Sequence, residues 1–307
     1  MTVNRNRHLL PEDWPNREFS QFIDAGTLNW HVQLHKPSAP KPLTLVLLHG
    51  TGASTHSWAG LIPSLLEFAH VVNMDLPGHA FTTGADLHAL TLPNMAQELH
   101  ALLVALKIKG PIAAVGHSAG APLAIEWALN SERYARATQR SGTTDFYFKH
   151  IVGLNPSLVP PPALYTNLLG PMVAPIATSS PMTSLLSTLA ANTGMVSQLL
   201  DSTQSQVPAH QRKYYQYLFS QAAHVKGSMG FMAGADLPAL LARGASLKVP
   251  ISFLVGAKDS WVKEVPLKAV IKESFPAAHV DTWPGGHLIH EEQPLETSAW
   301  IRARVNQ

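Results

Sequence analysis

Hydrophobic and polar residues follow two patterns along the chain, and these patterns predict strands and helices in alternation. A continuous apolar run, typical of a strand buried on both faces of a sheet, occurs at residues 43–50, and further strand-like stretches occur at residues 70–75, 111–118, 150–155, 249–259 and 278–287. Apolar residues at spacings of three and four predict helices between them, at residues 57–68, 90–107, 119–129, 261–275 and 291–304. Such alternation is typical of a parallel sheet with right-handed crossovers. The fold class is therefore α/β, and alternating residues at 19–24 and 28–36 add a hairpin before the first buried strand.

The alternation stops between residues 156 and 238. This segment is rich in Pro, Ser, Met, Leu and Ala, contains helix-like pieces at 182–191 and 210–225, and has no strand-like run. Because it is too long for a loop in a compact domain, we expect a helical cap inserted into the core. The predicted core comprises residues 1–155 and 239–307, and the predicted cap residues 156–238. An apolar cap over a pocket predicts a hydrophobic substrate.

Composition narrows the class of protein. The 307 residues are 46% hydrophobic and 14% charged, which suffices for one large core. The net charge is only +2 and the basic residues are scattered, so nothing indicates nucleic-acid binding. The absence of cysteine excludes disulfides, thiolate catalysis and cysteine-ligated zinc. The first thirty residues lack the apolar core of a signal peptide, and no apolar run is long enough to span a membrane, so we expect a soluble, cytoplasmic protein.

A possible nucleophile lies at the end of the predicted strand 111–118. The residues from Gly116 to Gly120 read G-H-S-A-G, and small residues on both sides of Ser118 permit a sharp turn from strand to helix. Such a turn exposes the hydroxyl and directs the first amides of the helix toward it. Because glycine-rich turns also bind phosphates or simply pack, Ser118 needs a base and an acid to count as a nucleophile.

Both partners follow later strands. Asp259 comes after the strand 249–259, and His287 comes after the next strand, behind the flexible pair Gly285 and Gly286. The order Ser, Asp, His along the chain is the one that this architecture of alternating strands and helices uses. We therefore predict Ser118 as nucleophile, His287 as base and Asp259 as the acid.

Other acids are less well placed for this role. The residue after the strand 150–155 is Asn155, which cannot carry the charge that stabilises an imidazolium. Asp145 lies in an irregular stretch, Asp236 in the cap, and Asp281 within a strand pattern.

The loop after the strand 43–50 can complete the site. It reads H-G-T-G-A-S from His49, and glycine allows close backbone approach, so we predict an oxyanion hole from the amides of Thr51 and Ala119. A plain turn or a phosphate loop remains an alternative, although no lysine follows Gly52 as in a Walker motif. We interpret His49 as a structural residue that orients this loop.

A metal site is not indicated. His287 and His290 stand three residues apart before Glu291 and Glu292, but this pattern lacks a third ligand at helical spacing. The predicted chemistry needs no metal and no cofactor.

Several stretches of the sequence resemble a known family. The stretches LVLLHGTGASTHSW, VVNMDLPGHAFT, VGHSAGAPLAIEWAL, IVGLNPSL and GGHLIHEEQP are similar in order and spacing to the α/β-hydrolase fold superfamily. The opening DWPNREFSQFIDAGTLNWHVQ, with HGTGASTHSW, resembles the magnesium-chelatase accessory proteins of bacteriochlorophyll synthesis. The first resemblance implies an eight-stranded, mostly parallel sheet and the site residues named above. The second implies a role near magnesium insertion, with chelatase subunits as partners.

The sequence departs from the family pattern in two places. Ala80 stands where the family usually has glycine, and residues 131–149 are longer and more polar than expected. We expect the first departure to cost little stability.

Two classes of function follow. The first is a serine hydrolase that cleaves a carboxylic ester of a hydrophobic substrate through an acyl-enzyme; acyl transfer, perhydrolysis and carbon–carbon cleavage use the same serine. The second is an accessory protein of the chelatase step that binds a porphyrin without catalysis.

Overall fold

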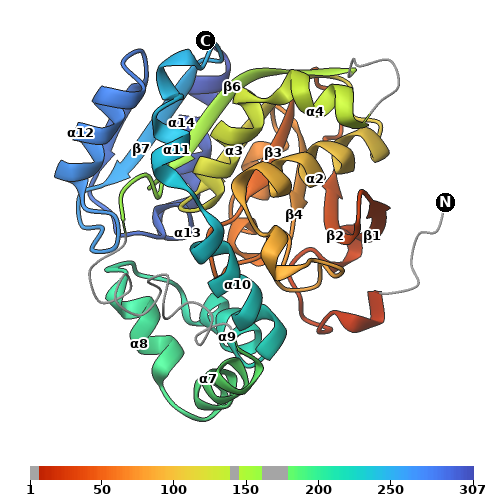
Figure 1. Ribbon diagram of the computed structural model, residues 1–307, viewed down its shortest axis with the longest axis vertical. Coiled ribbons are helices and arrows are strands. Elements are labelled where there is room, and N and C mark those ends of the chain that lie inside the picture. Colours follow the sequence, from red (N-terminus) through yellow and green to blue (C-terminus); the bar gives the residue numbers. More distant parts are fainter. Residues whose placement is uncertain (1–6, 139–144, 161–178) are drawn as a thin grey trace.

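An eight-stranded sheet forms the centre of the computed structural model, which describes residues 7–138, 145–160 and 179–307. Its strand order is β1-β2-β4-β3-β5-β6-β7-β8 (Figure 1). In chain order the strands are β1 (Ser20–Ala25), β2 (Leu28–His35), β3 (Thr44–Leu48), β4 (His70–Met74), β5 (Gly110–His117), β6 (Phe146–Leu154), β7 (Ile251–Gly256) and β8 (His279–Trp283).

The strands from β4 to β8 in this order are parallel, whereas β2 pairs with β4 and with β1 in antiparallel fashion. The predicted hairpin and the mostly parallel, eight-stranded sheet are thus confirmed. The chain passes from β3 outward to β4 and then back to β5 on the other side of β3. The loops after β3 and β5 therefore lie beside each other at the carboxyl edge, the place where ligands bind in sheets of this type.

Helices cover both faces of the sheet. The α-helices among the described residues are α1 (Ile62–Leu65), α2 (Leu92–Ala105), α3 (Gly120–Leu129), α4 (Ser131–Thr138), α7 (Ser180–Asn192), α8 (Met195–Ser202), α9 (Ala209–Phe219), α10 (Ala222–Gly234), α11 (Leu237–Leu241), α12 (Glu264–Ser274), α13 (Ile289–Glu292) and α14 (Pro294–Val305). Short 3-10 helices are η1 (Arg7–Leu9), η2 (Arg17–Phe19), η3 (Thr55–Trp58), η4 (Leu87–Ala89) and η5 (Gly244–Ser246).

Each face of the sheet has its own apolar core. On one face Leu99 of α2 and Leu123 of α3 pack with Leu267 of α12, and Figure 1 shows α2 and α3 in front of the strands. On the other face Ile62 of α1 and Ile301 of α14 belong to a second core. Strands β3 and β7 are buried along their whole length, as continuous apolar runs predict.

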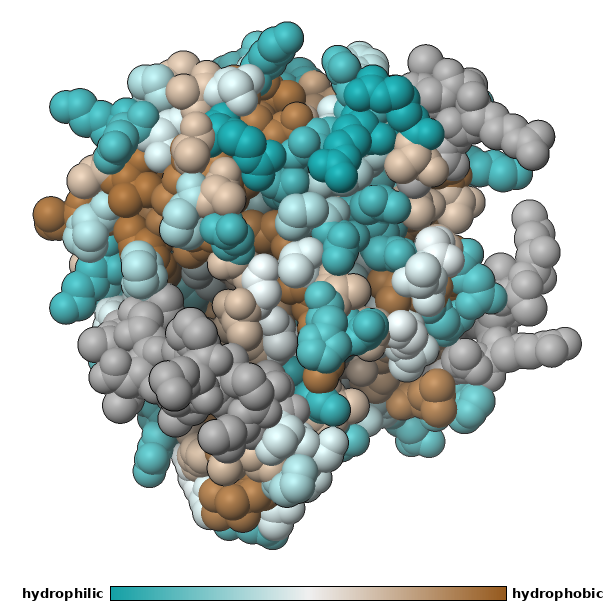
Figure 2. Space-filling model, viewed as in Figure 1, coloured by the Kyte–Doolittle hydropathy of each residue, from teal (hydrophilic) through white to brown (hydrophobic). Residues whose placement is uncertain are grey.

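The helices between β6 and β7 form the helical insertion that the pattern predicts. Helices α7 to α10 lie beyond the carboxyl edge of the sheet, at the lower end of the molecule in Figure 1. A small core joins them to the sheet loops, since Val196 and Tyr215 pack with Ala53 and Leu288. Figure 2 shows brown surface at this end, where Leu185 and Leu189 of α7 are exposed. The exact cap boundaries at residues 156 and 238 stay a prediction.

Several predicted elements are shorter or broken. The helix predicted at 57–68 is replaced by η3 and the four-residue α1, with Gly60 between them and Pro63 in the first turn of α1. Residues 210–225 form two helices, α9 and α10. The last helix is divided at Pro294, whose ring cannot continue a helix, and β8 stops before Pro284.

The stretch that looked irregular also contains regular structure. Residues 131–138 form α4, and β6 begins at Phe146 rather than near residue 150. Within the described ranges, no helix has both the length and the apolar character needed to cross a membrane.

Candidate active site

Ser118 occupies a strained turn between β5 and α3. Its φ is +49°, in the left-handed region that a serine rarely adopts. A Cβ on Gly116 would lie 2.4 Å from the Gly120 carbonyl carbon, and a Cβ on Gly120 would lie 2.1 Å from the Leu48 carbonyl oxygen. Both glycines are therefore required for this close approach of backbone, as the G-x-S-x-G pattern predicts. Strain of this kind concentrates at functional sites.

The structure brings the three predicted residues into hydrogen-bond distance. Ser118 Oγ lies 2.9 Å from His287 Nε2, and His287 Nδ1 lies 2.7 Å from Asp259 Oδ2. All three are at least nine-tenths buried. Because an ionised carboxylate only accepts, His287 donates from Nδ1 and accepts the serine hydroxyl proton at Nε2. This arrangement can transfer a proton from Ser118 to His287.

Asp259 is fixed by its own loop. Its Oδ1 accepts hydrogen bonds from the amides of Trp261 (2.8 Å) and Val262 (2.9 Å), which leaves Oδ2 for His287. The Trp261 ring stacks on the His287 ring, with 5.7 Å between the ring centroids.

The other acids lie in different places. Asp145 pairs with Lys109 at the surface, Asp236 caps α11, and Asp281 bonds His279 and the Trp300 indole. None of these three contacts the His287 ring.

Side chains and backbone groups from distant parts of the chain hold the histidine loop. Asn155 Nδ2 donates to the carbonyls of Gly286 and His287, both at 2.8 Å, while its Oδ1 accepts from the Gly256 amide. His117 Nε2 also donates to the His287 carbonyl at 2.9 Å. Asn155 cannot act as an acid, as the sequence indicates, but its amide side chain fixes the loop of His287. An asparagine directly after a strand could have indicated a hydrogen-bond donor at the carboxyl edge of the sheet.

The helical insertion supplies two more contacts to this loop. The His287 amide donates to the Thr203 carbonyl at 3.0 Å, and the Leu288 amide donates to Ser205 Oγ at 2.8 Å. A Cβ on Gly286 would lie only 2.4 Å from the backbone of Gln204. The glycine we expected to give flexibility therefore allows a close contact with the segment after α8.

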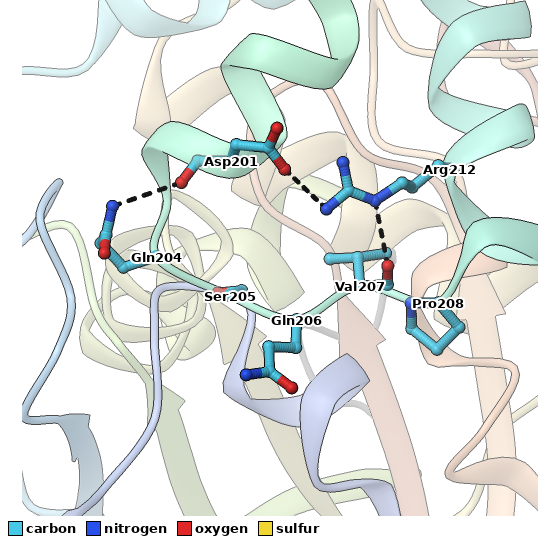
Figure 3. A pocket seen from close by; sticks show the side chains of 7 residues that line it. All are labelled: Asp201, Gln204, Ser205, Gln206, Val207, Pro208 and Arg212. Atoms are coloured by element: carbon cyan, nitrogen blue, oxygen red, sulfur yellow. Dashed lines mark hydrogen bonds and ion pairs between the residues drawn. The ribbon is translucent and has the colours of Figure 1, made fainter.

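The outer side of this segment borders a surface hollow of about 540 Å³ (Figure 3). There the Arg212 guanidinium contacts the Asp201 carboxylate at 2.7 Å and the Val207 carbonyl at 3.0 Å. No residue of the predicted triad lines this hollow.

The loop after β3 approaches Ser118 closely. A Cβ on Gly50 would lie 3.0 Å from the Ser118 Cβ, and the turn is closed by the Ala53 amide, which donates to the Gly50 carbonyl. Among the described residues, the amides of Thr51 and Ala119 have no acceptor. Their role as an oxyanion hole stays a prediction.

His49 bridges two loops at the carboxyl edge. Its Nδ1 donates to the Gly50 carbonyl (2.8 Å) and its Nε2 accepts from the Leu76 amide (2.9 Å). Burial, together with the nearby His79, lowers the pKa of His49 to about 3, so the ring is neutral. These contacts support its structural interpretation.

Ser157 was not identified from the sequence. Its Oγ lies 2.9 Å from Ser118 Oγ, and its amide donates to the Ser118 carbonyl. If Ser118 donates to His287, Ser157 is the donor to Ser118. A lone serine after a strand gives no signal of such a contact.

His290 and Glu291 have environments unlike that of a metal site. His290 is buried between the rings of Trp58 and His117, and the ring nitrogens of His287 are both engaged. Burial raises the pKa of Glu291 to about 8, and the Tyr215 hydroxyl, which donates to it at 2.6 Å, opposes this shift.

Comparison with known proteins agrees with this architecture. The model of the alpha/beta hydrolase family matches residues 45–300. The magnesium-chelatase 30 kDa subunit of Rhodobacter capsulatus is 31% identical over 283 residues, which are 92% of this chain and 93% of that protein. The monoacylglycerol lipase ABHD6 of Mus musculus is 24% identical over 285 residues, covering 87% of this chain and 75% of the lipase.

Solved structures show the same fold at low identity. An alpha/beta hydrolase from Nostoc sp PCC 7120 has a TM-score of 0.69 and 19% identity, over 94% of this chain and 98% of that one. The epoxide hydrolase CorEH has a TM-score of 0.68 and 16% identity, with the same coverage of both chains. Since the family model covers most of the chain and the chelatase subunit exceeds 30% identity along nearly all of it, this protein belongs to the alpha/beta hydrolase family.

Proposed function

We propose that this protein is a serine hydrolase that cleaves a carboxylic ester of a hydrophobic substrate. The observation that carries the proposal is the buried chain of hydrogen bonds from Ser118 through His287 to Asp259. A binding scaffold has no need of all three residue types in this order. The apolar composition of the segment 156–238, which we propose acts as the cap, favours an apolar acyl or alcohol group.

The reaction would proceed through an acyl-enzyme. Ser118 Oγ attacks the ester carbonyl carbon while His287 Nε2 accepts the hydroxyl proton, and Asp259 stabilises the imidazolium. The amides of Thr51 and Ala119 would hold the oxyanion, each worth about 3 kcal/mol of barrier. His287 then gives its proton to the leaving alcohol. Water, activated by the same histidine, releases the acid and restores Ser118. An acceptor other than water would give acyl transfer or perhydrolysis at the same serine.

A second function is favoured by one relative. The Rhodobacter capsulatus protein is described as a magnesium-chelatase subunit, and the similarity extends over 92% of this chain. We therefore propose that the physiological role is linked to magnesium chelatase and that the substrate is hydrophobic or tetrapyrrole-related. The alternative is an accessory protein that binds a porphyrin or a chelatase subunit and does not use Ser118 for chemistry.

Two measurements on the same samples separate these functions. Nitrophenyl esters of increasing acyl length are assayed with the wild type and Ser118→Ala, and porphyrin binding is followed by the Soret band. The hydrolase proposal expects turnover that rises with acyl length and is lost in Ser118→Ala. Absence of turnover with every ester, together with a Soret shift of equal size in both proteins, would favour the accessory function instead.

A further inference from the structure

His224 of α10 lies between the two loops that follow β3 and β4. Its Nδ1 accepts a hydrogen bond from the Ala80 amide at 2.9 Å, and its Nε2 donates to the Gly52 carbonyl at 3.2 Å. The side chain is 2% exposed. Because Nδ1 accepts, the ring proton resides on Nε2, so both nitrogens are used by the neutral form.

The hydrogen bond from His224 to Gly52 is accepted by a peptide group whose carbonyl and amide are both hydrogen-bonded. The carbonyl of the Gly52–Ala53 peptide accepts from His224, and the amide of the same peptide donates to the Gly50 carbonyl at 3.1 Å. This peptide closes the four-residue turn that contains Thr51, and Gly52 at its third position has φ +77°, as a type II turn requires. The Thr51 amide belongs to the first peptide of this turn, so its orientation depends on the turn remaining closed.

Besides the contact from His224, the helical insertion contacts this turn through Phe219. A Cβ on Gly52 would lie 2.8 Å from Phe219 Cζ at the end of α9. One turn beyond His224, a Cβ on Gly227 would lie 1.8 Å from the Gly78 carbonyl oxygen, so α10 rests directly on the loop after β4. These contacts fix the distance between His224 and both loops, since a close-packed contact leaves no room for sliding.

We propose that His224 is a positioning residue for the oxyanion hole. It acts from the helical insertion by holding the Gly52–Ala53 peptide, and thereby the Thr51 amide, in the orientation that a developing oxyanion needs. The inference rests on the proposed hydrolase function. It makes the insertion part of the catalytic apparatus as well as a cover for the substrate.

The effect should appear in the chemical step. A ground-state ester carbonyl contacts the oxyanion amides weakly, whereas the tetrahedral intermediate depends on them. Removing a whole oxyanion donor lowers kcat by about 10²–10³-fold, so a displaced donor should lower it by about 10–100-fold, with KM changed less than about threefold.

The test uses substitutions that separate the two nitrogens. His224→Gln can place an amide N–H near the position of Nε2 and keep the bond to Gly52, whereas His224→Asn can keep only the acceptor for the Ala80 amide. His210→Asn, at an exposed position of α9, is the matched control. For each variant we would measure kcat and KM with a nitrophenyl ester, the rate of labelling by a fluorophosphonate, and the Tm.

We expect His224→Asn to lose about 10–100-fold in kcat and in labelling rate, and His224→Gln to stay within about threefold of the wild type at a similar loss of Tm. His210→Asn should match the wild type. Equal kcat in the Asn variant and the wild type, or equal losses in the Asn and Gln variants, would overturn the positioning role. If His224→Asn does not fold, His224→Met, which has the length of glutamine and no donor, takes its place. Absence of labelling in the wild type would instead overturn the hydrolase function itself, and the inference with it.

Discussion

The turn around Ser118 and the loop of His287 meet at the candidate active site, and different kinds of contact hold them there. The turn around Ser118 depends on two glycines close to it in sequence, because side chains at Gly116 and Gly120 would collide with backbone. The loop of His287 is held by Asn155 after β6, by His117 beside the nucleophile, and by Thr203 and Ser205 in the helical insertion. The first region can be identified from one short sequence motif, although Leu48 and Ser157 also pack against it, whereas the second depends on residues scattered along the chain. Substitutions in the two regions should therefore have different effects on stability and on kcat.

The largest effect is expected from Gly120→Ala, which disrupts the local turn. The new Cβ would lie 2.1 Å from the Leu48 carbonyl oxygen and 2.8 Å from that of His49, both backbone atoms. Overpacking against backbone should lower the free energy of unfolding by at least about 3 kcal/mol, measured by urea denaturation. Gly194→Ala is the control, because no atom lies within 4 Å of the position that its Cβ would take. Similar stability of both variants would contradict the tight turn.

A pH-dependent effect is expected beside the histidine loop, at Glu291. Burial raises the pKa of Glu291 to about 8, so the folded protein keeps the proton that the unfolded chain releases near pH 4.5. Stability should therefore fall as the pH rises from about 4.5 to 8 and stay low above that range, by up to several kcal/mol at about 1.4 kcal/mol per pKa unit.

Glu291→Gln removes this loss and keeps an acceptor for the Tyr215 hydroxyl. Its Tm should exceed that of the wild type increasingly between about pH 5 and 8. The exposed Glu296→Gln should show a constant difference from the wild type over this range. A Tm difference that does not change with pH for Glu291→Gln would show that Glu291 is ionised in the fold.

Asn155→Asp damages the histidine loop from a distance. Aspartate retains the acceptor for the Gly256 amide but cannot donate to both carbonyls of Gly286 and His287. Displacement of His287 should lower kcat for an ester by about 10²-fold, while the turn around Ser118 stays intact. The exposed Asn306→Asp should have wild-type kinetics. Undiminished kcat in Asn155→Asp would mean that the loop is held without this amide.

The smallest effect is expected at Ala80. Its φ of +44° lies in the left-handed region, which explains why the family usually has glycine there. Ala80→Gly should raise the free energy of unfolding by about 0.5 kcal/mol, because relief of strain outweighs the greater entropy of the unfolded chain. Ala191→Gly, at an exposed position of helix α7, should lower it by about 1 kcal/mol. If both substitutions changed the free energy of unfolding in the same direction, this would contradict backbone strain at Ala80.

The same contrast explains what the sequence could predict. The order of strands and helices, the turn around Ser118, and the positions of Asp259 and His287 at strand ends follow from local patterns. The roles of Asn155, Ser205 and His224 do not, because each acts on a loop more than 80 residues away along the chain. A pattern of apolar spacing carries no information about such contacts. Proline and glycine also divided helices at positions where apolar spacing alone predicted continuity.

The nucleophilic role of Ser118 is tested most directly by the mass of the protein after reaction with a fluorophosphonate. We expect one adduct per chain, located at Ser118 by peptide mapping, with none in Ser118→Ala and a labelling rate reduced by at least about 10²-fold in His287→Ala. An unlabelled wild type, or an adduct at another residue, would contradict it.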